Sequence, residues 1–241
     1  MTALLEVAGV GKRFGGFVAL EEIHLDVDAG ERLGLIGPNG SGKSTLVNCL
    51  CGTLRHETGS VRFAGRSLDG MQAHRRTRLG LARSFQLPRP FASLTVAEHF
   101  RIPIIYAVNA RPGTKRDVEA RTMELLHLVG LADQAQRLPR DLSQIEMRKL
   151  ELARAMAAEP LLLIADEVMA GLSPPEVDEI LALLLQLNEQ GMTIILIEHI
   201  VRAVMQFSRR LVVLVAGRKI ADGLPAEVVR DPEVERAYLG E

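Results

Sequence analysis

Residues 37–45 read Gly-Pro-Asn-Gly-Ser-Gly-Lys-Ser-Thr, a complete G-x-x-x-x-G-K-[ST] phosphate-binding loop. The apolar run of residues 33–36 precedes the loop and apolar residues at helical spacing follow it, so we expect it to join a strand to a helix. Its glycines allow backbone N–H groups to turn towards an anion, and the N-terminus of the helix adds partial positive charge. The stretch therefore predicts a nucleoside-triphosphate site.

Different residues of this loop are predicted to contact different parts of a bound triphosphate and its metal ion. Lys43 reaches the β- and γ-phosphates, and the hydroxyl of Ser44 is placed to ligate Mg²⁺. The other predicted contacts come from the rest of the loop, namely Gly37, Pro38, Asn39, Gly40, Ser41, Gly42 and Thr45.

Composition limits the classes of protein to consider. The chain has 241 residues, 24% of them charged, and a formal net charge of −1, so it lacks the basic field that drives non-specific binding to nucleic acid. The basic run Arg75–Arg78 together with Arg83 is interpreted as a solvated face. No stretch approaches eighteen apolar residues and the N-terminus does not resemble a signal peptide, so we expect no membrane span.

Hydrophobic patterning predicts the order of the elements. Residues 4–36 show short strand patterns, residues 95–158 show apolar residues at helical spacing, and an apolar strand pattern returns at 161–164. Strands that alternate with helices indicate a mostly parallel sheet. We predict one α/β domain over 1–241, with an N-terminal antiparallel β subdomain. Residues 1–87 and 159–241 form its nucleotide-binding core, and residues 88–158 form an inserted helical subdomain.

Polar side chains follow the predicted strands where an open α/β sheet collects its ligand contacts. Asp166 is predicted to hold Mg²⁺, commonly through water, and Glu167 to orient or deprotonate the water that attacks the γ-phosphate. His199, after the apolar run 194–197, is placed to bond the γ-phosphate. Gln86 follows another strand pattern, and its amide is suited to Mg²⁺ or the attacking water.

The order of these features resembles the nucleotide-binding subunit of ABC transporters, and the similarity covers nearly the whole chain. The motifs that carry it are Gly37–Thr45, Gln86, Leu142-Ser143, Leu161–Glu167 and His199. Within that superfamily the chain is similar to the ATPases of branched-chain amino-acid importers in the segments Arg83–Gln86, Leu150–Ala155, Ala170–Leu172, Ile197–His199 and Arg236–Glu241.

The resemblance implies a peripheral ATPase on the cytoplasmic side of the cell membrane that uses ATP and Mg²⁺. Its partners would be integral-membrane permease subunits, a second ABC ATPase and, indirectly, a periplasmic or extracellular substrate-binding protein, with no role for nucleic acid. Phe14 would stack on adenine, although a core aromatic is the alternative. Gln86 would couple nucleotide state to the permease, and His199 would be the switch histidine.

Residues 142–146 depart from the family's Leu-Ser-Gly-Gly-Gln signature, because they read Leu-Ser-Gln-Ile-Glu. In the family this segment contacts the γ-phosphate held by the other subunit. Ser143 keeps the hydroxyl, whereas Ile145 adds bulk and Glu146 adds a negative charge that repels phosphate unless it points away. Ser173 also replaces the usual Asp of the family's D-loop. These departures favour a heterodimer with a related ATPase whose signature is intact, and a homodimer is the alternative.

Other interpretations stay open at this point. The same ATPase could serve another cargo, such as urea or amides, aromatic acids, or lipopolysaccharide for export. The altered signature also suits a nucleotide-binding regulatory subunit with little turnover, although Glu167 and His199 argue against it. A soluble ABC protein of DNA repair or translation would need long insertions or tandem cassettes, for which 241 residues leave little room.

Overall fold

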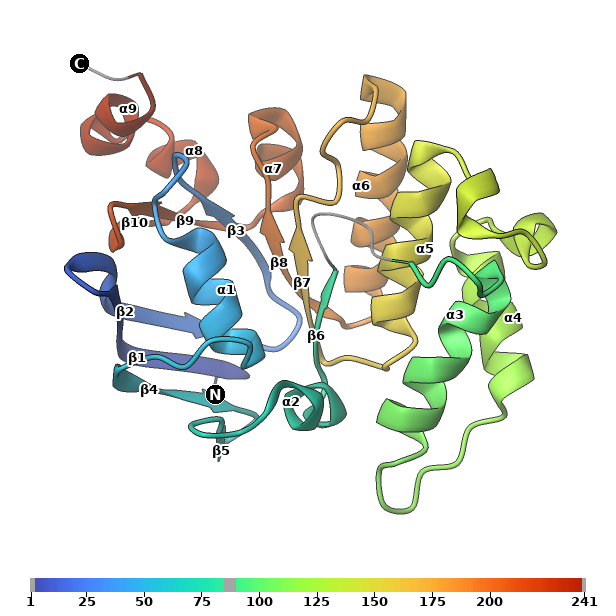
Figure 1. The fold of residues 1–241 in the computed structure, drawn as a ribbon. Coiled ribbons are helices and arrows are strands. Elements are labelled where there is room, and N and C mark those ends of the chain that lie inside the picture. The colour runs from blue at the N-terminus through green and yellow to red at the C-terminus, as the bar shows by residue number, and fades with distance from the viewer. Residues whose placement is uncertain (1–2, 85–89, 240–241) are drawn as a thin grey trace.

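A four-stranded and a six-stranded sheet, with helices around them, make up the fold (Figure 1). The computed structural model describes residues 3–84 and 90–239. The smaller sheet is antiparallel, has the order β2-β1-β4-β5, and consists of β1 (Leu5–Phe14), β2 (Phe17–Val27), β4 (Thr58–Phe63) and β5 (Arg66–Ser67).

The larger sheet carries the strand ends at which the predicted site residues gather. Its order is β10-β9-β3-β8-β7-β6, and all neighbours are parallel except β10, which pairs antiparallel with β9. The strands are β3 (Arg32–Ile36), β6 (Leu81–Ser84), β7 (Leu162–Asp166), β8 (Thr193–Ile197), β9 (Arg210–Val215) and β10 (Arg218–Gly223).

Helix α1 (Lys43–Cys51) lies between the two sheets (Figure 1). Alternate residues of the parallel strands face opposite sides. Leu162 and Ile164 of β7 join the core formed with α1 and the antiparallel sheet. Leu163 and Ala165 join a second core with the helices on the other face. Because both faces are covered, these strands are apolar throughout, as parallel strands usually are.

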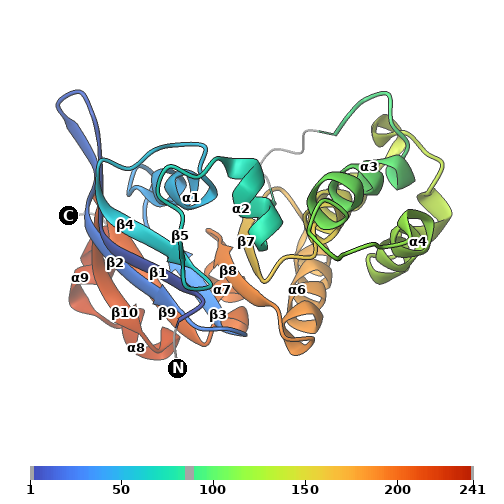
Figure 2. The ribbon, with the colours of Figure 1, turned by 90° about the horizontal axis from the view of Figure 1, so that it is seen from below.

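The second core extends into a helical arm on the far side of the molecule from β1 and β2 (Figure 2). Its helices are α3 (Val96–Pro103), a π-helix (Ile104–Val108), α4 (Val118–Leu128) and α5 (Gln144–Met156). Two short 3₁₀-helices, Ala132–Gln134 and Pro139–Asp141, precede α5. The remaining α-helices of the described residues are α2 (Ala73–Leu79), α6 (Pro174–Glu189), α7 (Val201–Phe207), α8 (Pro225–Val228) and α9 (Pro232–Leu239).

The predicted fold class is confirmed, down to the antiparallel N-terminal sheet and the mostly parallel core. Within residues 4–36 the sequence has separate short strand patterns at 17–20 and 23–27, but the structure joins these two into one strand, β2. In this strand Glu22 has a positive φ of 51° and the register with β1 shifts. The range 88–158 contains the helical arm, but its lower edge lies among residues outside the description. Over the described residues, no helix has the length and apolar character needed to cross a bilayer.

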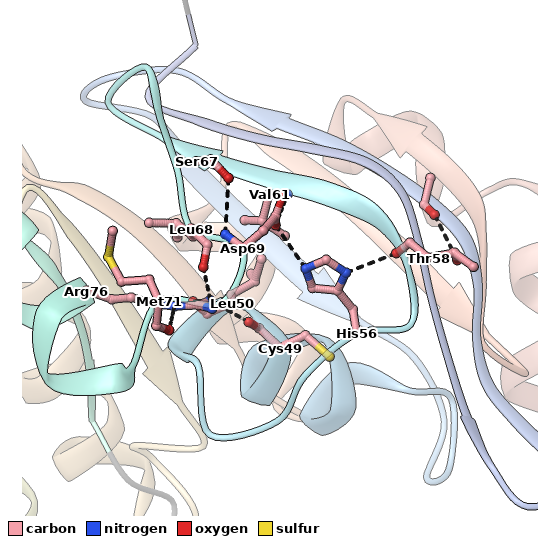
Figure 3. A network of polar contacts seen from close by, with 11 residues as sticks. Cys49, Leu50, His56, Thr58, Val61, Ser67, Leu68, Asp69, Met71 and Arg76 are labelled. Atoms are coloured by element: carbon pink, nitrogen blue, oxygen red, sulfur yellow. Dashed lines mark hydrogen bonds and ion pairs between the residues drawn. The ribbon is translucent and has the colours of Figure 1, made fainter.

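The interpretation of Arg75–Arg78 and Arg83 as a solvated face is wrong for two of these arginines. Arg76 is buried, and its guanidinium donates to the carbonyl oxygens of Cys49, Leu50 and Leu68 at 2.7, 2.7 and 2.8 Å (Figure 3). Arg83 pairs with Asp166. A buried guanidinium is stable only when acceptors surround it, and those acceptors come from residues distant in sequence.

Candidate functional site

The phosphate-binding loop turns at the carboxyl end of β3 and leads directly into α1. Gly37 and Gly42 have φ values of 155° and 103°. A Cβ on Gly37 would overlap the carbonyl oxygen of Leu214, and one on Gly42 would lie 2.7 Å from the carbonyl oxygen of Ala19. Both positions therefore require glycine, for close approach as well as for backbone conformation.

The loop, the end of β7 and the end of β8 surround a cavity of about 210 Å³. Because the N-terminus of α1 opens into it, unpaired helix N–H groups and the helix dipole favour an anion there. The lining residues are Phe17, Ala19, Asn39, Gly40, Ser41, Gly42, Lys43, Ser44, Thr45, Glu167 and His199.

Lys43 supplies the positive charge of this cavity. Its Nζ donates to the carbonyl oxygens of Gly37 at 2.6 Å and Pro38 at 3.1 Å. Burial lowers the pKa of Lys43, whereas the carboxylates of Glu167 and Asp166 oppose that shift. A buried ammonium between backbone acceptors and two carboxylates can exchange part of this set for phosphate oxygens.

Asp166 is the last residue of β7 and Glu167 follows it, and the two carboxylates have different environments. Asp166 is 4% exposed, and its Oδ2 lies 2.6 Å from Nη2 of Arg83. Glu167 adopts a φ of 49°, which is uncommon for a residue with a side chain. Its N–H donates to the carbonyl of Ile197 at 2.8 Å, and its Oε1 lies 3.1 Å from Nε2 of His199. Strain of this kind tends to occur at functional sites.

Glu198 is a further polar group at this edge of the sheet that the sequence did not identify as important. It is 3% exposed, and its Oε1 accepts a hydrogen bond from the N–H of Met169 at 2.7 Å. Burial raises the pKa of Glu198 to about 7. Together with the bond between Glu167 and Ile197, this contact ties the segment after Glu167 to the segment that carries His199.

Phe17 was also missed by the sequence prediction, which selected Phe14. The two residues lie opposite each other at the end of the β1–β2 hairpin, where Phe14 pairs in register with Phe17. Phe17 lines the cavity, whereas Phe14 is half exposed and has the ammonium of Lys12 5.3 Å from its ring centre. A second aromatic directly across a Gly-Gly turn is the signal that would have identified it.

The residues that line the cavity do not include five of the predicted site residues, namely Phe14, Gly37, Pro38, Ser143 and Asp166. Ser143 caps the N-terminus of α5, and it does not belong to the cavity lining. Gln86 lies outside the described residues. The structure therefore brings together the loop, Glu167 and His199, with Asp166 at the adjoining strand end.

The altered signature segment forms a capping box at the start of α5. The N–H of Ser143 donates to Oε2 of Glu146 at 2.7 Å, and the N–H of Glu146 donates to Oγ of Ser143 at 3.4 Å. The backbone hydrogen bond from Ser143 lowers the pKa of Glu146. A negative charge thus occupies this helix N-terminus, where it satisfies an otherwise unpaired donor.

Known proteins are similar to this chain in sequence and in fold. Residues 20–170 match the family described as ABC transporter, and residues 218–241 match the one described as branched-chain amino acid ATP-binding cassette transporter. The chain is 36% identical to the high-affinity branched-chain amino acid transport ATP-binding protein BraF of Pseudomonas aeruginosa, over 99% of this chain and 98% of that one.

Two further relatives extend this likeness. LivG of Escherichia coli K12, a high-affinity branched-chain amino acid transport ATP-binding protein, is 35% identical over 99% of this chain and 98% of its own. Among solved structures, the ADP conformation of MJ1267, an ATP-binding cassette of an ABC transporter, matches with a TM-score of 0.88. It is 30% identical, and the match covers all of both chains.

Proposed function

The chain belongs to the ABC transporter family as an ATP-binding subunit, and we propose that it drives import of branched-chain or related amino acids through a membrane permease. The observation that carries its ATPase role is the convergence of the phosphate-binding loop, Glu167 and His199 on one cavity. The assignment of cargo draws on the transport systems named for BraF and LivG, which match this chain end to end.

Catalysis is proposed to depend mainly on position and charge, as is general for phosphoryl transfer. The loop N–H groups and Lys43 hold the phosphates and offset their growing charge. Glu167, which lines the cavity, orients the attacking water and accepts its proton. His199 holds the Glu167 carboxylate at 3.1 Å and is placed to donate to the γ-phosphate.

Mg²⁺ fits the donor set that the chain offers beside the loop. Ser44 and Asp166 supply hydroxyl and carboxylate oxygens, the hard ligands that this ion prefers. Within the described residues, no hydrogen bond to Oδ1 of Asp166 is found, while Oδ2 is bonded to Arg83. Ser44 and Asp166 would hold the ion with help from Gln86, and its charge would offset that of the β- and γ-phosphates.

The direct test is Glu167→Gln with Glu189→Gln as a matched control. Glu189 is exposed at the end of α6, so the same chemical change there should alter nothing. We expect Glu167→Gln to bind ATP like the native chain and to lose at least about 100-fold in turnover, the usual contribution of a general base. Full turnover in Glu167→Gln would remove this residue from the catalytic role.

The second ATPase is proposed to be a related chain with an intact signature rather than another copy. In the family, the start of α5 closes on the phosphate bound by the other subunit. Here Glu146 puts a carboxylate at that helix end and bonds it to Ser143 at 2.7 Å, which disfavours a second anion. A site that used this segment would be weak, whereas the site on this chain's own loop would be complete with the partner's signature.

This asymmetry predicts slow hydrolysis by the chain alone. Replacement of Ile145 by Gly together with Glu146 by Gln should raise that rate, because it restores a bare backbone and removes the charge. If the purified native chain already hydrolyses ATP at the rate of the complete transporter, and the double replacement changes nothing, the heterodimer proposal is wrong.

The permease is proposed to bind the groove between α2, β6 and the helical arm, on the cytoplasmic side of the membrane. This groove has a volume of about 550 Å³ and a largely apolar lining that includes Ile102, Phe91 and Tyr106. Tyr106 is 66% exposed and Phe91 49%, and exposed apolar side chains that line one groove form the kind of contiguous patch that marks an interaction site. A substrate-binding protein would act on this chain only through the permease.

Retention on permease-containing membranes tests this surface. Tyr106→Asp should release the chain from such membranes and leave ATP binding unchanged. Met123→Asp is the control, because Met123 is also exposed but lies on α4, outside the groove lining. Equal retention of both variants would exclude the groove.

A further inference from the structure

Arg83 connects the elements that carry two of the predicted Mg²⁺ ligands, Ser44 on α1 and Asp166 on β7. It lies on β6, the strand that leads to Gln86, and its Nη2 donates to Oδ2 of Asp166 at 2.6 Å. Its Nη1 donates to Oδ1 of Asn48 at 2.7 Å. Asn48 stands four residues after Ser44 on α1, so the two occupy the same face of that helix.

We propose that Arg83 is a positioning residue for the metal site, because its guanidinium fixes the Asp166 carboxylate relative to the helix that carries Ser44. The inference rests on the proposed function, in which Asp166 and Ser44 are the ligands. It adds a residue that is not itself a ligand but sets the separation and orientation of two that are.

The contact geometry requires arginine rather than a positive charge alone. A planar guanidinium presents donors in a fixed fork, so one side chain can reach two acceptors on different elements at once. The side chain of Arg83 is 15% exposed and that of Asp166 is 5% exposed, so solvent screens this pair weakly. A lysine would keep the charge but would lack the fork.

The same bond engages one oxygen of the Asp166 carboxylate and leaves the other available. Arg83 engages Oδ2, and Oδ1 has no hydrogen bond within residues 3–84 and 90–239. Arg83 therefore reserves Oδ1 for the ion or for a water bound to it. Partners of this kind orient metal ligands in many sites, and their loss typically lowers metal affinity about 10- to 100-fold.

Charge and geometry have opposite consequences for the ion, which makes the proposal testable. Removal of the positive charge by itself would strengthen cation binding, because like charges repel. Loss of the fork would weaken it, because Asp166 and α1 would no longer be held together. Arg83→Lys isolates the second effect, since the charge is retained.

The experiment measures Mn²⁺ binding to the full chain by electron paramagnetic resonance, with a non-hydrolysable ATP analogue present. Affinity for the analogue without metal is measured in parallel by calorimetry. We expect Arg83→Lys to weaken Mn²⁺ about 10- to 100-fold and to leave metal-free analogue affinity within about twofold. Arg75→Lys is the control, because Arg75 is exposed on α2.

Asn48→Leu tests the second contact of the guanidinium independently. It should also weaken Mn²⁺, and combination with Arg83→Lys should add little, because both changes break one connection. Asn48 Oδ1 also accepts from the hydroxyl of Thr53 at 3.2 Å, so Thr53→Val controls for that loss. A double variant whose effects simply add would contradict the connection.

Asp166→Asn separates this inference from the function on which it rests. If Asp166→Asn weakens Mn²⁺ and Arg83→Lys does not, Arg83 is only a structural ion pair and the inference fails. If Arg83→Lys lowers metal-free and metal-bound affinities equally, the inference also fails. If Asp166→Asn leaves Mn²⁺ binding unchanged, the proposed metal site itself is wrong.

Discussion

Arg76→Met is expected to destabilise the fold strongly, although it replaces one residue in a run of surface-like charges. The guanidinium of Arg76 lies among four backbone carbonyls, those of Cys49, Leu50, Leu68 and Met71 (Figure 3). The first two belong to the last turn of α1, whose carbonyls have no partner within the helix. Arg76 therefore satisfies the end of the helix that begins at the phosphate-binding loop.

The magnitude follows from the contacts that the change removes. Methionine keeps the aliphatic stem and its packing, so the loss is confined to hydrogen bonds. Hydrogen bonds to a charged group contribute about 1.5–3 kcal/mol each, but the guanidinium regains hydration when the chain unfolds, which offsets much of their sum. With the three fully buried carbonyls left unsatisfied at about 1 kcal/mol each, we expect a loss of roughly 3 kcal/mol.

Urea unfolding followed by circular dichroism measures this loss as a shift of the midpoint at constant slope. Arg76→Lys should cost less, about 1–2 kcal/mol, because an ammonium reaches fewer carbonyls but remains charged. Arg75→Met is the control and should stay within about 0.5 kcal/mol, as exposed substitutions do. A loss below about 1 kcal/mol for Arg76→Met would refute the reasoning.

Three further changes test separate parts of the site. Lys43→Ala should lower ATP affinity at least about tenfold, because a charged donor to phosphate contributes ~1.5–3 kcal/mol; fluorescence titration measures it, and native affinity would contradict the loop assignment. The pKa of Glu198 is raised from 4.5 to about 7, so the folded state binds the proton more tightly and stability falls as pH rises across that window. Glu198→Gln should remove this dependence, on the order of 3 kcal/mol between pH 4.5 and 7, in urea unfolding at several pH values; an unchanged pH profile would count against it. Phe17→Ala should weaken ATP binding, measured by calorimetry, about 2- to 10-fold, the range for loss of one aromatic contact. Phe14→Ala is the comparison. If Phe14→Ala weakens binding and Phe17→Ala does not, a role for Phe17 is contradicted.

Local patterns in the sequence were sufficient for most of the fold. The phosphate-binding loop fixes a strand before it and a helix after it, and α1 begins at Lys43 as its glycines predict. Ser143 opens α5 because a capping residue followed three positions later by a carboxylate is a local signal. The apolar runs at β7 and β8 are buried on both faces, so their continuous hydrophobicity was readable as parallel strands.

Contacts between distant segments were not readable in the same way. Glu198 and Met169 are separated by 29 residues, and Arg83 and Asp166 by 83. In the sequence, a single carboxylate after a strand, such as Glu198, is expected to be exposed to solvent. Its burial can be predicted only if the position of its hydrogen-bond donor, the N–H of Met169, is known. Arg83 did carry a weak signal, because a charged residue within the apolar strand Leu81–Ser84 needs a partner when that strand is buried.

The three arginines at positions 75, 76 and 83 show why composition alone misjudged this region. Arg75 and Arg76 are neighbours in one polar run, yet Arg75 is exposed and Arg76 is buried among carbonyls. Arg83 lies in a different context, the apolar strand β6, and pairs with a carboxylate. Backbone carbonyls are present at every residue and leave no mark in the sequence, so a buried arginine that uses them cannot be distinguished from a solvated one. A run of charged residues therefore indicates the charge of the surface only after its buried members have been identified. In this chain Arg76 stabilises the end of α1 and Arg83 holds the Asp166 carboxylate at the end of β7, and the proposed site depends on both.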